Sequence, residues 1–77
     1  MKLRDAVISF QCLPHDLLQV IETVDGSDFR HERVIRDPDV VTEMEKKYMF
    51  FAEQAATARK QIKRGQSCTF NVYYREP

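Results

Sequence analysis

Apolar residues between positions 37 and 65 recur every three or four residues, which is the spacing of a helix with one buried face. Asp37 is a suitable N-cap, Pro38 fits the first helical position, and Gly65 is a common helix stop. The pattern therefore predicts one long helix over residues 37–65, about 40 Å in length. Its expected buried positions are Val41, Met44, Tyr48, Phe51, Ala55, Ala58 and Ile62.

Three further segments have the composition of β-strands. Residues 67–74 alternate at period two, with Cys68, Phe70, Val72 and Tyr74 on one face and Thr69, Asn71 and Tyr73 on the other. Residues 6–13 carry apolar side chains on both faces, which is typical of a central strand. Residues 29–36 are highly charged, so we expect that strand at a sheet edge, where charge discourages pairing with other chains.

Residues 14–25 fit two structures. As a helix, the segment starts at Pro14, stops before Gly26 and places its aliphatic side chains on one stripe. As a strand, residues 19–24 would form a hairpin with residues 29–36 through the turn at 25–28. Helical spacing collects more of the apolar residues on one face, so we favour the helix. That stripe consists of Leu17, Val20, Ile21 and Val24.

These elements predict a single α+β domain over residues 1–77. The expected order is β-α-β-α-β, a single-layer sheet of three strands with the long helix packed on one face; the alternative order is β-β-β-α-β. A chain of 77 residues buries only about 60% of the surface that its unfolded state exposes, so the core should be thin.

The composition is that of a globular protein with balanced charge. Hydrophobic residues make up 43% and charged residues 31%, and 12 basic residues balance 12 acidic ones. This neutrality argues against a dedicated nucleic-acid-binding domain, which needs an excess of Lys and Arg. No apolar run reaches the length of a membrane span, and the charged start is unlike a signal peptide. We therefore expect a cytoplasmic protein that does not engage membranes.

Catalytic and metal-binding patterns are weak. Cys12 and His15 have the spacing of half a zinc site, but His31 and Cys68 form no second pair. We expect both cysteines to be reduced and to act as small apolar residues. The chain has no phosphate-binding loop and no nucleophile motif, and a chain this short rarely encloses a water-excluded pocket. The sequence thus predicts no metal, no cofactor and no enzymatic activity.

The end of the predicted helix is basic, with Arg59, Lys60, Lys63 and Arg64. Positive charge at a helix C-terminus complements the helix dipole, which is the simpler explanation. The alternative is contact with phosphates, so a nucleic-acid-binding module that uses these four residues is our second hypothesis.

Two large apolar side chains point away from the predicted buried stripe. At 100° per residue, Phe50 lies roughly 120° and Met49 roughly 140° from its centre. Methionine and aromatic residues are enriched at protein interfaces, so this pair predicts a contact with another protein or a second copy of the chain. The predicted edge strand adds Arg30, Arg33 and Arg36 to the candidate surface.

We therefore expect a small non-enzymatic regulator or inhibitor that acts by binding another protein. Its size class is that of inhibitors encoded by phages and other mobile elements, an analogy of size alone.

Overall fold

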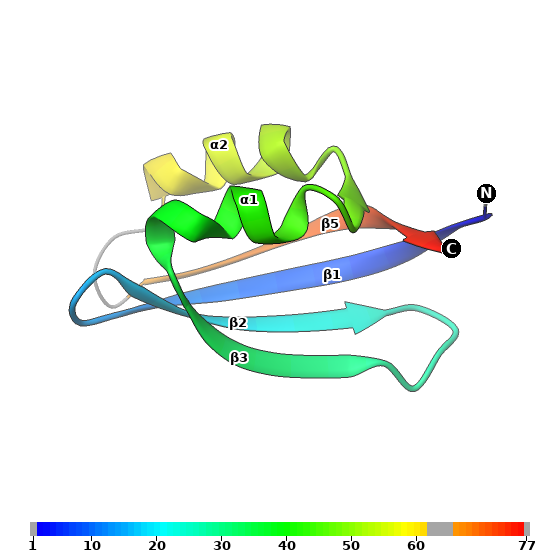
Figure 1. Cartoon of the computed structure of the whole chain (residues 1–77), viewed down its shortest axis with the longest axis horizontal. Helices are drawn as coiled ribbons and strands as arrows, with labels where there is room; N and C mark the ends of the chain where they lie inside the picture. Colours follow the sequence, from blue (N-terminus) through cyan, green and yellow to red (C-terminus); the bar gives the residue numbers. More distant parts are fainter. Residues whose placement is uncertain (1, 62–65, 77) are drawn as a thin grey trace.

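Five antiparallel strands form one sheet in the order β3-β2-β1-β5-β4 (Figure 1). The structure is a computed structural model that describes residues 2–61 and 66–76. The strands are β1 (Lys2–Leu13), β2 (Leu17–Val24), β3 (Arg30–Arg36), β4 (Tyr48–Met49) and β5 (Ser67–Glu76). The helical elements are the 3₁₀ turn η1 (Asp37–Asp39), α1 (Val40–Met44) and α2 (Phe51–Gln61).

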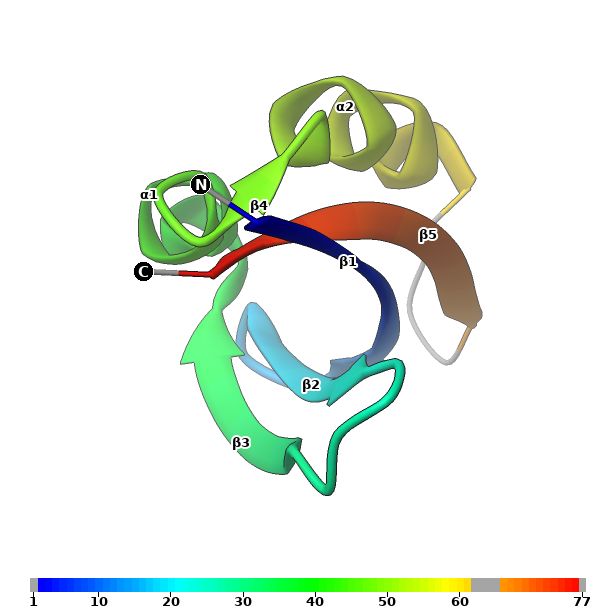
Figure 2. The same ribbon diagram turned by 90° about the vertical axis from the view of Figure 1, so that its right-hand side faces the viewer.

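The sheet curls into a half-barrel. Figure 2 shows β5, β1, β2 and β3 following one another around an arc, with α1 at its open side between β3 and β4. The second helix, α2, lies against β5. The radius of gyration is 11.9 Å, close to the value of about 11.5 Å expected for a compact chain of this length. In the described part of the chain, no helix has both the length and the apolar character needed to cross a membrane.

The core lies on the inner face of this curl. Even-numbered residues of β1, β2 and β5 face inward because side chains alternate along a strand, and the register aligns Ile8 with both Glu22 and Phe70. Both helices add to the same core. Its buried apolar members are Ala6, Ile8, Phe10, Leu18, Val20, Val24, Val40, Met44, Tyr48, Phe51, Ala55, Ala58, Phe70 and Val72.

The predicted three-strand sheet with one long helix is wrong. The helical turn does begin at Asp37, with Pro38 in its first positions, but α1 ends at Met44 and the chain enters the short strand β4 before α2. The predicted stop at Gly65 and the buried position Ile62 lie outside the described residues. The other residues that were predicted to be buried are nevertheless buried or half-buried, because α1, β4 and α2 present them to the core. They are Val41, Met44, Tyr48, Phe51, Ala55 and Ala58.

The helix breaks where contacts with β5 replace helical hydrogen bonds. Arg75 donates its backbone N–H to the carbonyl of Lys47 and its guanidinium to the carbonyls of Glu45 and Lys46. Phe50 then takes a left-handed conformation with φ of 62°, which redirects the chain into α2. A sequence without glycine or proline at this point gave no signal for the break.

The favoured helix over residues 14–25 is also wrong. This segment forms a tight turn, with His15 and Asp16 at positive φ, followed by β2. β2 pairs with β3, which is the alternative hairpin. Burial alternates strictly along β2, but one inner position is Glu22. Because Glu22 is charged, the alternation of apolar and polar residues that identifies a strand is broken in the sequence at this position.

Predictions for the other strands are confirmed. Residues 6–13 lie in the central strand β1, and the charged segment forms the edge strand β3. In β5 the two predicted faces are seen, and the face of Cys68, Phe70, Val72 and Tyr74 is more buried than the face that carries Tyr73.

Candidate functional site

An exposed apolar patch lies on the outer face of the sheet, around Tyr73. Asp5 pairs with Tyr73 in the register, so its strand neighbours Leu3 and Val7 lie diagonally across from the tyrosine ring, on the same face. Met49 of β4 lies directly opposite Tyr73 on the other side. We call the group Leu3, Val7, Met49, Phe50 and Tyr73 the Tyr73 patch.

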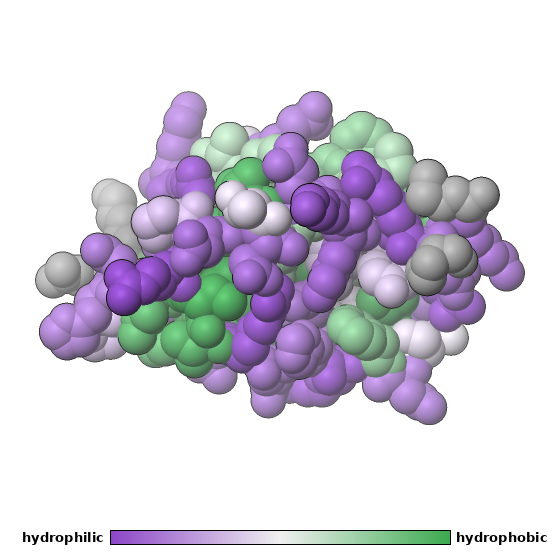
Figure 3. Space-filling view, in the orientation of Figure 1, coloured by the Kyte–Doolittle hydropathy of each residue, from purple (hydrophilic) through white to green (hydrophobic). Residues whose placement is uncertain are grey.

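Most of the patch is open to solvent. Leu3, Val7, Phe50 and Tyr73 are between 37% and 52% exposed, and Met49 is half-buried. Among the residues that the structure describes, six large apolar side chains are exposed, and these four are the majority. Figure 3 shows part of this apolar surface as a pale green area over the start of α2.

Phe50 is held against Tyr73 in an unfavourable backbone conformation. The two rings meet edge to face with centroids 6.2 Å apart. A positive φ at a bulky side chain is rare and costs on the order of 1–3 kcal/mol, and such residues cluster at functional sites. The Phe50 carbonyl accepts a hydrogen bond from the N–H of Gln54, so the strained residue is anchored to the first turn of α2.

On β1, β2 and β5 the outer face beyond the patch carries one charged side chain besides Asp5, that of Arg75, which lies opposite Leu3 and donates to the carbonyls of Glu45 and Lys46. The uncharged side chains of this face include Ser9, Gln11, Gln19, Ile21, Thr23, Ser67, Thr69 and Asn71. Ser9 and Thr69 share a hydrogen bond of 3.2 Å. One carboxylate, that of Asp5, lies among the residues of the Tyr73 patch, on β1 between Leu3 and Val7.

The structure separates the two halves of the predicted protein-binding surface. Met49 and Phe50 lie beside β5, whereas the three arginines lie on β3 at the opposite edge of the sheet. Arg30 forms an exposed ion pair with Glu32, and Arg36 is exposed at the end of β3. Arg33 points inward.

Arg33 belongs to a buried charge cluster at the open side of the curl. Glu22 is 0% exposed; its Oε2 accepts a hydrogen bond of 2.6 Å from the Tyr48 hydroxyl, and its Oε1 lies 3.3 Å from Arg33 Nε. Arg33 also donates to Glu43 on α1 at 2.7 Å. Burial, and then the hydrogen bond to Glu22, raise the pKa of Tyr48 above its ordinary range. The cluster ties β2, β3, α1 and β4 together.

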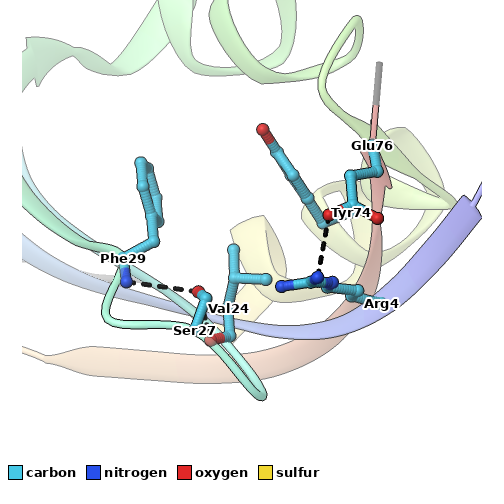
Figure 4. Close-up of a pocket in the computed structure, with 6 residues that line it drawn as sticks. All are labelled: Arg4, Val24, Ser27, Phe29, Tyr74 and Glu76. Carbon is cyan, nitrogen blue, oxygen red and sulfur yellow. Dashed lines mark hydrogen bonds and ion pairs between the residues drawn. The ribbon is translucent and has the colours of Figure 1, made fainter.

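A second feature of the inner face is an open cavity of about 470 Å³. It lies at the end of the curl where the β2–β3 turn approaches β5, and Figure 4 shows Phe29 and Tyr74 on opposite sides of it. Their rings are nearly parallel, at 23°, with centroids 6.3 Å apart. The remaining lining residues are Arg4, Val24, Ser27 and Glu76, and Arg4 forms an ion pair of 2.9 Å with Glu76.

The residues of the nucleic-acid hypothesis are only partly described. The guanidinium of Arg59 donates to the carbonyl of Asp37 at 3.4 Å, which ties α2 to η1, and Lys60 is exposed. Lys63 and Arg64 lie outside the described residues.

The candidate thiol and imidazole ligands are spread across the fold. Cys12 and Cys68 are free, half-buried residues on the inner faces of β1 and β5; burial, and then the charge of Asp37, raise the pKa of Cys12. His15 is in the β1–β2 turn, and His31 lies on β3 with Nδ1 3.6 Å from the Glu22 carboxylate. Within residues 2–61 and 66–76, no three His, Cys, Asp or Glu side chains are close enough to hold a metal ion.

Sequence analysis missed most residues of both surfaces. It placed Tyr73 on the same face as the polar residues Thr69 and Asn71, which was a usable signal, but nothing joined that face to Leu3 and Val7, about 70 residues earlier. Phe29 and Tyr74 are likewise brought together only by the curl. No protein-family model, curated protein sequence or solved structure matches this chain.

Proposed function

We propose that this protein is a small non-enzymatic regulator or inhibitor that binds another protein through the Tyr73 patch. The observation that carries the proposal is the gathering of four of the six exposed large apolar side chains of the described chain around one tyrosine. Single exposed apolar residues are ordinary, whereas a contiguous group marks an interaction surface.

The chemistry of the patch supports a protein partner. Tyrosine, phenylalanine and methionine are enriched at the centre of protein interfaces. Phe50 keeps a costly backbone conformation while its ring remains half in water, and the burial of that ring by a partner supplies a reason for the strain. Beyond Val7 the outer face of β1 and β5 carries uncharged side chains, so a partner that extends in that direction approaches with little cost of desolvation.

Asp5 favours a different protein over a second copy as the partner. Two copies joined symmetrically at Tyr73 would bring their Asp5 carboxylates close together, and such like charges are destabilising. A partner that presents an apolar surface with a Lys or Arg opposite Asp5 would match the patch in shape and charge. We place this interaction in the cytoplasm.

The test compares two equally exposed apolar positions. Phe50→Glu changes the patch, and Val34→Glu, on the opposite edge of the sheet, is the matched control. In both variants the free energy of unfolding should stay within about 0.5 kcal/mol of the wild-type value, as for an ordinary surface substitution. We expect one host protein to be captured by the wild type and by Val34→Glu but not by Phe50→Glu.

Binding is then measured with the purified partner. Loss of a central interface aromatic costs about 2 kcal/mol or more, so the Kd for Phe50→Glu should rise about 30-fold or more. Asp5→Lys should weaken the complex mainly by slowing association. A partner that binds Phe50→Glu as tightly as the wild type would refute the assignment of this surface.

A further inference from the structure

We propose that the cavity between Phe29 and Tyr74 binds a single purine-like base, as part of a free nucleobase or nucleoside. Its ligand is a flat heteroaromatic ring that carries hydrogen-bond donors and acceptors along its edge. The cavity lies on the inner side of the curl, whereas the Tyr73 patch lies on the outer face, so this inference does not rest on the proposed function.

The two aromatic rings have the geometry of a clamp. Carbon atoms in contact are about 3.5–4.0 Å apart, so a ring held between two others needs about 7 Å between their planes. The centroids of Phe29 and Tyr74 are 6.3 Å apart and their planes differ by 23°. The separation of the two planes is at most this centroid distance, so the rings must move apart by about 1 Å or more to admit a flat ring. Phe29 is 40% exposed and lies just before β3, so its side chain has room for that movement.

The cavity floor supplies both kinds of polar partner. Arg4 and Glu76 form an ion pair of 2.9 Å, and each side chain is about one-third exposed, so both retain groups that can face a ligand. A guanidinium donates to ring nitrogen and carbonyl acceptors, and a carboxylate accepts from ring N–H and amino groups. A ring with both functions on its edge can bond to both members of the pair, and purine bases have them.

Ser27 has a separate role. Its hydroxyl donates to the carbonyl of Val24 and accepts from the N–H of Phe29, so its one donor is used in fixing the turn that carries the clamp. The serine therefore positions Phe29 and has no hydrogen-bond donor left for the ligand.

The size and charge of the cavity favour a small ligand over a nucleic-acid strand. A volume of about 470 Å³ falls in the range of small-molecule sites, roughly 300–1,000 Å³. The lining contains one cation and one anion, whereas a groove for a strand needs a basic track along the phosphates.

The experiment titrates the whole chain with guanosine and adenosine and follows tyrosine fluorescence and calorimetry. Indole is the control ligand because it has the flat ring but a single donor. We expect a purine nucleoside to bind with a Kd below about 1 mM and at least tenfold more tightly than indole. Absence of saturable nucleoside binding, or equal binding of indole, would overturn the proposal.

Variants assign the binding to this cavity. Phe29→Ala should weaken nucleoside binding about tenfold or more, and Phe29→Tyr should restore it. Phe50→Ala is the matched control, since it removes another exposed phenylalanine ring, from the outer face, and should leave binding unchanged. Phe29→Ala that stays folded and binds like the wild type would overturn the assignment.

Each of the two proposals can be refuted without the other, because a different variant tests each site. Phe29→Ala should leave the protein partner bound, and Phe50→Glu should leave the nucleoside bound. Loss of both ligands in either variant would show that the surfaces are not separate and would contradict this inference.

Discussion

The buried Glu22 carboxylate makes the stability of this small protein depend on Arg33. The carboxylate is 0% exposed, with Arg33 Nε 3.3 Å away and the Tyr48 hydroxyl 2.6 Å away. Arg33→Met keeps much of the side-chain volume but removes the only arginine paired with Glu22 among the described residues. Removal of one partner of a buried ion pair costs about 3–5 kcal/mol. The Arg33 side chain is 21% exposed, so we expect the lower end, about 3 kcal/mol.

That cost is large for a chain of this length. At 0.05–0.15 kcal/mol per residue, 77 residues have a stability of about 4–12 kcal/mol. With an m-value of about 1 kcal/mol per molar urea, the midpoint of Arg33→Met should fall by about 3 M. The matched control is Arg30→Met, which removes the exposed ion pair with Glu32 from the same strand and should cost less than about 1 kcal/mol.

A double variant tests whether the loss arises from the unpaired charge. Glu22→Leu combined with Arg33→Met removes both charges, and replacement of a buried pair by apolar residues is often close to neutral. The double variant should therefore be more stable than Arg33→Met alone. Equal urea midpoints for Arg33→Met and Arg30→Met would refute this account. A double variant that is less stable than Arg33→Met would refute it as well.

Three further outcomes follow from individual residues. The pKa of Tyr48 in the folded state is raised above 10.0, so its neutral phenol contributes stability below pH 10 that is lost as the pH rises further. Urea midpoints should therefore fall above pH 10, and they should fall less in Tyr48→Phe. Phe50→Gly should be about 1 kcal/mol more stable than Phe50→Ala by thermal unfolding, since glycine adopts positive φ without steric cost. The raised pKa of Cys12 predicts slower alkylation of that thiol in the native protein at pH 8 than after denaturation, followed by mass spectrometry.

The sequence predicted which residues are buried better than which elements contain them. Met44, Tyr48, Phe51 and Ala55 are in the core as the helical spacing required, although a strand and a left-handed residue interrupt the helix. A periodic pattern reports which side chains face inward, and two short helices with a reversal between them satisfy it as well as one long helix does. The interruption depends on Arg75, which arrives from the other end of the chain.

The error over β2 has a specific physical cause. Alternation along β2 requires four inner residues, and Glu22 is one of them. Pattern analysis assigns a charged residue to solvent because its burial is costly without partners. Those partners, Tyr48 and Arg33, come from separate elements that only the finished fold brings together. A buried charge is therefore the point at which reasoning from local pattern failed for this chain.

Apart from Met49 and Phe50, the residues of the two proposed sites could not be predicted, because both sites depend on the register of β5. Tyr73 and Tyr74 are adjacent, yet strand alternation sends the first ring outward to Phe50 and the second inward to Phe29. A shift of β5 by one residue relative to β1 would exchange the two rings and would also expose Phe70 and Val72. The burial of Phe70 and Val72 thus fixes the register, and with it the position of both tyrosines. For this reason, changes at Tyr73 and Tyr74 should affect different ligands even though the residues are neighbours in the sequence.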